Sequence, residues 1–191
     1  MYARRDVAAY AGHMDPVVTI RRATAADASA LSRLGAETFR ETFAGDNTPE
    51  DLEQYIAEAF TPDRQAIEIA DPSSTVLLAE HKDDRGGSDL IGYAHLVSGE
   101  APESVSGPAP IELKRIYVAK AWQGRRVAQA LMDASLDAAR ARGARTLWLG
   151  VWERNPRALA FYEKYGFTRV GEQTFVLGND EQTDWLFARV L

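Results

Sequence analysis

Cysteine is absent from the chain of 191 residues. Its absence excludes disulfide bonds, thiolate metal ligands and a covalent cysteine nucleophile. The three histidines, His13, His81 and His95, stand singly, without the i, i+4 spacing or the neighbouring carboxylates that are typical of a metal site. We therefore expect no bound metal.

Long hydrophobic runs are also missing. No apolar run approaches the roughly 18 residues that span a membrane. The first residues, MYARRDVAAYAGH, offer only VAAYAG as an apolar stretch, which is too short for a signal-peptide core. We expect a cytoplasmic protein with no membrane partner. Residues 1–15 are expected to be a disordered extension, with Met14 as an alternative start, and residues 16–191 to be a single domain.

Basic residues are outnumbered by acidic ones. The chain has 22 lysines and arginines against 28 aspartates and glutamates, which gives a net charge of −6. This balance argues against sequence-independent binding of nucleic acid, which needs a basic face. It suits a cationic partner, and it equally suits simple solubility. Apolar residues make up 46% of the chain, which is typical of a folded globular domain.

Residue periodicity and turn signals predict a mixed α/β sheet. Strands are predicted at 17–24, 74–84, 89–100, 111–118, 145–152, 168–177 and 183–191, and helices at 27–42, 48–60, 124–142 and 156–165. The strand at 145–152 is apolar at nearly every position, as expected for a strand with both faces covered. The predicted order of elements is β α α β β β α β α β β.

A basic turn opens the predicted helix 124–142, directly after a strand. Arg125 and Arg126 stand there, and the helix has no acidic residue before Asp133. The first N–H groups of a helix and its dipole attract an anion, so two arginines beside them are unfavourable unless an anion offsets their charge. A diphosphate would do so, whereas a solvated basic turn is the alternative.

Two motifs resemble those of the Gcn5-related N-acetyltransferases, the GNAT superfamily. The segment QGRRVA, Gln123 to Ala128, is similar to the family's pyrophosphate loop R/Q-x-x-G-x-G/A, although Arg126 stands at the first glycine position. The segment WLGVWERNPRALAFYEKYGF contains the family's signature N-x-x-A-x-x-F-Y-x-K-x-G-F. The predicted order of elements also resembles the family's fold.

The resemblance covers residues 17–191 and narrows to one type. The stretches ETFRETFAGDNTPEDLEQYIAEAF, IELKRIYV, LWLGVWERN and GNDEQTDWLFARVL look like PaiA-type acetyltransferases, which acetylate spermidine and spermine. The resemblance implies a mostly antiparallel mixed sheet of about seven strands flanked by about four helices. It also implies acetyl-CoA as co-substrate and a small-molecule amine as acceptor, and it allows a homodimer.

The resemblance assigns a set of residues to acetyl-CoA. Main-chain groups of the strand before the loop would contact the pantetheine, and one N–H would polarise the thioester carbonyl. Asn155 would contact the cofactor as well as cap its helix, and the cap alone would explain it. The set is Ile116, Tyr117, Val118, Gln123, Gly124, Arg125, Arg126, Val127, Ala128 and Asn155.

The chemistry needs an acid and a base, because an ammonium must lose a proton and a thiolate should gain one. Without a cysteine, direct attack by the amine is the natural route. Tyr162, the tyrosine of the family's F-Y pair, is the candidate acid; core packing beside Leu159 is the alternative. Glu112 is the candidate base, acting through a water, and an ordinary exposed strand carboxylate is the alternative.

An acidic and aromatic segment is the candidate acceptor site. It contains Glu37, Phe39, Glu41, Phe43 and Asp46, which suit a flexible polycation and are equally explained by helix amphipathicity. Two other functions stay open: acetylation of protein or peptide amines, and a CoA-binding regulatory module without turnover, to which the arginine in the loop points.

Overall fold

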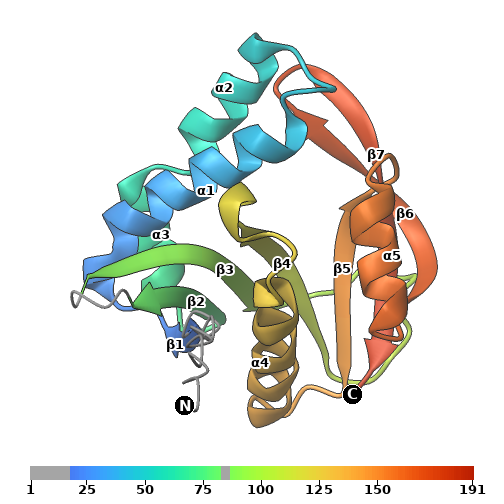
Figure 1. Ribbon diagram of the computed structural model, residues 1–191. Helices are drawn as coiled ribbons and strands as arrows, with labels where there is room; N and C mark the ends of the chain where they lie inside the picture. The colour runs from blue at the N-terminus through green and yellow to red at the C-terminus, as the bar shows by residue number, and fades with distance from the viewer. Residues whose placement is uncertain (1–17, 83–86) are drawn as a thin grey trace, which may run out of the picture.

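The computed structural model describes residues 18–82 and 87–191, so the expected extension at residues 1–15 lies outside it. In this part of the chain seven strands form one sheet, accompanied by five α-helices and two short 3-10 helices (Figure 1). The strands are β1 (Val18–Arg22), β2 (Ser74–Lys82), β3 (Ser88–Ser98), β4 (Pro110–Val118), β5 (Thr146–Trp152), β6 (Thr168–Leu177) and β7 (Asp180–Val190). The helices are α1 (Ala28–Phe43), α2 (Pro49–Ala59), α3 (Pro62–Ala70), α4 (Val127–Ala141) and α5 (Pro156–Lys164), and the 3-10 helices are η1 (Ala25–Asp27) and η2 (Lys120–Trp122).

The helix α3 is missing from the predicted order, which becomes β α α α β β β α β α β β with five α-helices instead of about four. Its start carries the same signals as that of α2. Thr61 Oγ1 accepts a hydrogen bond from the Arg64 N–H at 3.1 Å, and Pro62 occupies the first helical position. Thr48 and Pro49 do the same for α2.

The sheet has the strand order β1-β2-β3-β4-β5-β7-β6. All neighbouring strands are antiparallel except β4 and β5, which are parallel and are joined through α4. This confirms the predicted mixed, mostly antiparallel sheet. Because β4 and β5 are parallel, α4 must run back along the sheet from the C-terminal end of β4 to the N-terminal end of β5, as in any crossover connection.

Helices cover both faces of the sheet. One core contains Leu131 of α4 and Tyr162 of α5 against alternate strand residues, and a second contains Leu34 of α1 and Ile56 of α2 against the other strand face. Strand β2 supplies Leu77 to the first core and Leu78 to the second, as the two-residue period of a strand dictates. Among the described residues, no helix is long and apolar enough to cross a membrane.

Candidate active site

The sheet opens between β4 and β5. These two strands are paired only from Pro110–Thr146 to Glu112–Trp148, while β4 continues along β3 and β5 continues along β7. Main-chain groups of β4 after Glu112 that point towards β5 are therefore left without a strand partner. In Figure 1 the two strands part from a common lower end and leave a wedge between them.

A bulge in β4 changes which side chains face the wedge. His95 pairs with Arg115 and Leu96 pairs with Leu113, so Lys114 is an extra residue in β4. Beyond a one-residue bulge, each side chain moves to the opposite sheet face. Arg115 consequently lies on the α1–α3 side together with Glu112, instead of on the side of α4 and α5.

A cleft of about 660 Å³ fills the wedge and extends between α1 and β7. It brings together the predicted acid and base with most of the predicted acceptor residues. Of the predicted residues it is lined by Phe39, Glu41, Phe43, Asp46, Glu112, Ile116, Tyr117, Val118, Gln123, Ala128, Asn155 and Tyr162. The remaining ones, which do not line it, are Glu37, Gly124, Arg125, Arg126 and Val127.

Tyr162 reaches the cleft from α5. The helix begins where Asn155 Oδ1 accepts a hydrogen bond from the Ala158 N–H at 3.1 Å, and Pro156 occupies its first position. The Tyr162 side chain is buried, and burial together with the nearby Asp184 carboxylate raises the pKa of its hydroxyl well above the ordinary value. Tyr162 therefore keeps its proton and can donate a hydrogen bond into the cleft.

Glu112 lies at the apex of the wedge, where β4 and β5 separate. It is half-buried, and burial raises the pKa of its carboxyl group, although Lys114 and Arg115 partly offset this rise. Among the described residues it forms no ion pair. Its carboxylate is thus positioned to act as a base or to hold a cation.

Asp184 of β7 is a further cleft residue, which sequence reasoning missed. Burial alone raises the pKa of its carboxyl group to about 6, and within the described part of the chain it has neither a hydrogen-bond partner nor an ion pair. Sequence does show an aspartate directly before the apolar run Trp185–Phe187. Its place in the cleft follows from the register of β7, which pairs Asp184 with Trp152 of β5, another residue that lines the cleft.

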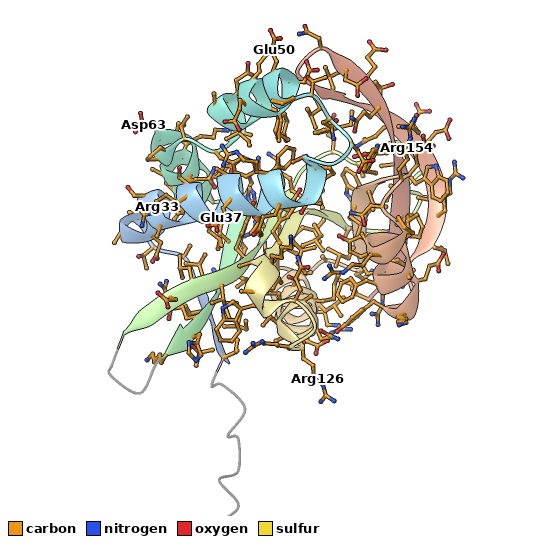
Figure 2. All side chains as sticks on the ribbon, turned by 45° about the horizontal axis from the view of Figure 1, so that its top comes forward. Arg33, Glu37, Glu50, Asp63, Arg126 and Arg154 are labelled. Carbon is orange, nitrogen blue, oxygen red and sulfur yellow. The ribbon has the colours of Figure 1, made fainter. Side chains whose placement is uncertain are left out.

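The loop before α4 differs from the prediction. The helix begins at Val127, so Arg125 and Arg126 precede it and do not belong to its first turn. Gly124 and Arg126 both have left-handed backbones, with φ angles of 79° and 62°. Figure 2 shows the Arg126 side chain extending away from the body of the protein.

Gln123 joins this loop to the wedge. Its Nε2 donates a hydrogen bond to the Val118 carbonyl at 3.3 Å, and its Oε1 accepts one from Arg157 at 2.6 Å. The Arg125 guanidinium lies 5.2 Å from the centre of the Trp122 ring. The first turn of α4, with Arg125 and Arg157 near it, therefore lies at one end of the wedge, and this arrangement suits an anionic ligand.

Aromatic rings line the opposite end of the cleft. Phe39 stacks on Tyr55 with 4.7 Å between ring centres, and Phe43 meets Trp152 edge-on at 5.8 Å. Glu41 of α1 accepts a hydrogen bond from the Lys120 main-chain N–H at 3.1 Å, just before the loop that contains Gln123. Glu37, by contrast, lies on the exposed surface of α1 (Figure 2) and does not line the cleft.

Hydrogen bonds between the β6–β7 hairpin and the region around the start of α2 close the aromatic end of the cleft. Asp51 at the start of α2 accepts a hydrogen bond from the Asn179 main-chain N–H at 2.8 Å. Gln182 of β7 donates one to Asn47 in the connection between α1 and α2. In Figure 1 the β6–β7 hairpin arches over to meet this connection. The cleft is thereby walled on the side where the two segments meet.

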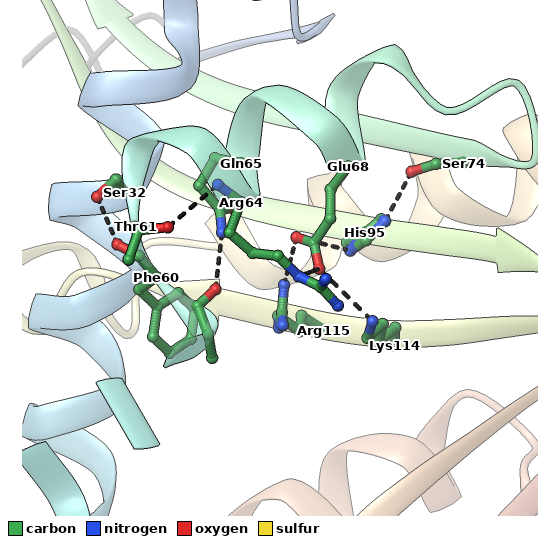
Figure 3. A network of polar contacts seen from close by, with 11 residues as sticks. Ser32, Phe60, Thr61, Arg64, Gln65, Glu68, Ser74, His95, Lys114 and Arg115 are labelled. Atoms are coloured by element: carbon green, nitrogen blue, oxygen red, sulfur yellow. Dashed lines mark hydrogen bonds and ion pairs between the residues drawn. The ribbon is translucent and has the colours of Figure 1, made fainter. Parts of the chain in front are cut away.

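A buried charge network lies behind the cleft (Figure 3). Glu68 of α3 accepts a hydrogen bond of 2.7 Å from Arg115, and Lys114 lies 3.5 Å from its other oxygen. His95 is buried, which lowers its pKa to about 4, and its Nε2 lies 2.7 Å from Ser74 Oγ. Arg115, although it lines the cleft, is therefore neutralised by Glu68.

Parted strands, cationic side chains near the start of α4 and a buried tyrosine beside carboxylates are the main features of this cleft. The acetyltransferase (GNAT) family model matches residues 36–167. An uncharacterised N-acetyltransferase of Lactobacillus delbrueckii subsp. lactis is 36% identical over 162 residues, which are 85% of this chain and 89% of the relative. The chain belongs to the GNAT family and is an N-acetyltransferase.

Two further proteins are similar to this chain. The N-alpha-acetyltransferase RimI of Mycobacterium tuberculosis is 32% identical over 155 residues, 81% of this chain and 80% of the relative. The crystal structure of the PaiA N-acetyltransferase of Thermoplasma acidophilum, in complex with coenzyme A, superposes with a TM-score of 0.72 at 21% identity, covering 92% of this chain and 99% of that chain. At this identity the second match shows the fold alone.

Proposed function

We propose that the enzyme acetylates a primary amine of a polyamine such as spermidine or spermine. The observation that carries this proposal is the set of carboxylates on the cleft. Asp46, Glu112 and Asp184 line it, and among the described residues none of them forms an ion pair. A polyamine carries several ammonium groups along an apolar chain, so such carboxylates can each hold one charge while aromatic rings contact the methylenes.

Several cations of the cleft are engaged by groups outside this set of carboxylates. Arg115 and Lys114 lie against Glu68, and Arg157 is hydrogen-bonded to Gln123. Arg154 also lines the cleft, and it lies 3.9 Å from Glu153. The unpaired carboxylates support a cationic acceptor, and the arginines near the start of α4 support an anionic carrier.

Acetyl-CoA, the co-substrate of the family, supplies an activated acetyl group. The residues present fit it. The main chain of β4 from Leu113 to Tyr117 has no strand partner on its β5 side and is open to hydrogen bonding there, as an extended pantetheine requires. The first turn of α4 and Arg125 offer N–H donors and positive charge to a diphosphate.

The residues of the cleft then serve the transfer. We assign Glu112, acting through a water, as a base that removes a proton from the amine nitrogen. Attack of the nitrogen lone pair on the thioester carbonyl carbon forms the C–N bond, and the C–S bond breaks. We assign Tyr162 as the acid that protonates the departing sulfur, because it is buried, protonated and aimed at the cleft.

Acetylation of a protein or peptide N-terminus is the second candidate, and the similarity to RimI favours it. A peptide carries carbonyl groups and side chains close to its reacting amine, so it needs a wider groove than a polyamine does. The bridge between Asp51 and Asn179 and the one between Asn47 and Gln182 narrow the acceptor end of this cleft. This narrowing supports a slender acceptor such as a polyamine.

Charge reversal at Asp46 tests the acceptor assignment. Asp46→Lys is expected to raise KM for spermine several-fold more than KM for a monoamine of similar length, since only the polyamine presents distal charges. The difference should shrink as salt rises, because the attraction is electrostatic. Glu37→Lys is the matched control, since Glu37 lies nearby in the chain but outside the cleft. Equal effects of Asp46→Lys on both amines would refute polyamine recognition.

A further inference from the structure

Asp184 lines the cleft from β7. It pairs with Trp152 of β5 on one side and with Gln173 of β6 on the other. A Cβ atom at Gly150 would lie 3.2 Å from Asp184 Oδ2 and 3.0 Å from Gln173 Nε2. A side chain at position 150 would therefore press against both groups, and the glycine avoids this contact.

The groups that face Asp184 are uncharged. Tyr55 of α2, Tyr162 of α5 and the Gln173 amide of β6 lie around it, and the pKa of each tyrosine is raised in part by the Asp184 charge. In the described residues no cation offsets this carboxylate, whereas Lys114 and Arg115 act on Glu112. Asp184 is thus a largely buried carboxylate without a compensating cation among the described residues, and it lies near Tyr162, the proposed acid.

The reaction itself leaves a role for a second carboxylate. An ammonium nitrogen must lose two protons to become an amide nitrogen that keeps one hydrogen. One proton leaves before attack, because an ammonium has no lone pair, and the other leaves the positively charged nitrogen after the C–N bond forms. One of the two replaces the lost acetyl group on the sulfur of CoA, and the other ends in solvent.

We propose that Asp184 binds the ammonium of the acceptor and takes its first proton, while Glu112 takes the second through its water. The Asp184 carboxylate becomes a carboxylic acid as the free amine forms, and it returns the proton to solvent after turnover. The pKa of about 6 agrees with this role, since the group is ionised at neutral pH and is a stronger base than an ordinary aspartate. The inference rests on amine acetylation in this cleft, whichever amine is the acceptor.

A pH profile separates this role from a structural one. With saturating acetyl-CoA, kcat/KM of the wild type should fall below an apparent pKa near 6, whichever amine is used. Asp184→Asn should lower kcat/KM by about 10² or more at neutral pH. It should also leave only the neutral amine reactive, so that its rate rises about tenfold per pH unit towards the pKa of the amine.

Two amines of similar size whose pKa values differ by about two units sharpen the test. The variant should strongly prefer the less basic amine, whereas the wild type should not. Asp180→Asn is the matched control on the same strand, since Asp180 does not line the main cleft. Asp184→Glu keeps a carboxylate, so its kcat/KM should be lower than that of the wild type but should still fall at low pH. This variant tests the role of Asp184 if the asparagine variant does not fold.

The inference would be overturned if kcat/KM of Asp184→Asn had the same pH dependence as the wild type. It would also be overturned if kcat/KM of Asp184→Glu no longer fell at low pH. If the fall of kcat/KM at low pH disappeared only in Glu112→Gln, the first proton would be assigned to Glu112, and the Asp184 inference would be overturned as well. The test uses any amine that the wild type acetylates. If the wild type acetylates other amines but not polyamines, the acceptor assignment is refuted. The Asp184 inference is then still tested with the amine that reacts.

Discussion

The guanidinium of Arg115 lies 2.7 Å from Glu68 Oε2, and both side chains are 8% exposed. The pair links β4, which lines the cleft, to α3 behind it. Burial by itself would raise the pKa of Glu68, but Arg115, His95 and Lys114 hold it below the ordinary value. The carboxylate is therefore ionised at neutral pH and balances a cation that would otherwise be buried alone.

Glu68→Ala is expected to destabilise the protein by about 3–5 kcal/mol, because it leaves Arg115 as an uncompensated buried charge. Denaturant unfolding at neutral pH measures this loss. Glu58→Ala on the exposed surface of α2 is the control, and it should change the free energy of unfolding by less than about 0.5 kcal/mol. Equal losses in the two variants would show that Arg115 finds another partner or water.

Arg126→Gly is expected to stabilise the protein. The φ angle of 62° at Arg126 costs a non-glycine residue about 1–2 kcal/mol, part of which is offset by the greater freedom of an unfolded glycine. The gain should be roughly 0.5–1 kcal/mol in thermal or denaturant unfolding. Arg126→Ala, which keeps a Cβ atom, should show no gain.

The same two variants test the reach of the arginine. Because Arg126 extends away from the protein, we expect the Kd of acetyl-CoA to rise by about fivefold at most. A much larger rise in both variants would mean that the guanidinium folds back onto the diphosphate when acetyl-CoA binds.

Tyr162→Phe is expected to lower kcat by about 10² to 10⁴ with little change in the Kd of acetyl-CoA, since the ring stays and only the proton donor is lost. Steady-state kinetics and a thermal-shift titration measure the two quantities. Tyr165→Phe serves as control, because its hydroxyl donates to Asp133 at 3.1 Å outside the cleft. Wild-type turnover in Tyr162→Phe would return Tyr162 to a packing role.

Asp184→Asn is expected to stabilise the folded enzyme at neutral pH. Burial raises the pKa of Asp184 from 3.8 to about 6 on folding, so the native state binds its proton more tightly than the unfolded state does. The stability gained from that proton is complete below the unfolded pKa and is lost as pH rises through about 6. The asparagine variant lacks this loss.

Unfolding free energies of wild type and Asp184→Asn should therefore converge towards pH 4 and differ by roughly 1–3 kcal/mol above pH 7. Denaturant melts across this range, without amine, measure the difference. A gap that does not change with pH would contradict the raised pKa, whatever the effect on activity.

Much of the fold could be predicted because local signals and topology agree. The N-caps and prolines of α2 and α5 mark helix starts, and the short continuous apolar runs of β2 and β3 mark strands. The start of α4 was predicted too early, because arginine favours helices and nothing in the sequence indicates that Arg126 has a left-handed backbone. The start of α3 carried the same Thr-Pro signal as α2 and could have been predicted.

The site was predictable only where motif and strand position sufficed. Tyr162 and Glu112 reach one cleft because α5 follows β5 and because β4 parts from β5 directly after Glu112. Asp184 could not be found, because its place depends on the register of β7 against β5. The same limit applies to Glu37 and Glu41, which lie on one helix, although only Glu41 faces the cleft.

One measurement tests the central claim most directly: release of free CoA thiol from acetyl-CoA by the wild-type enzyme with a panel of amines. The panel contains spermidine, spermine, a monoamine of similar length, and a peptide with a free N-terminus and a lysine. We predict that kcat/KM is highest for spermine or spermidine, because only they engage the free carboxylates at the acceptor end along their whole length. A higher kcat/KM for the peptide would contradict the polyamine assignment.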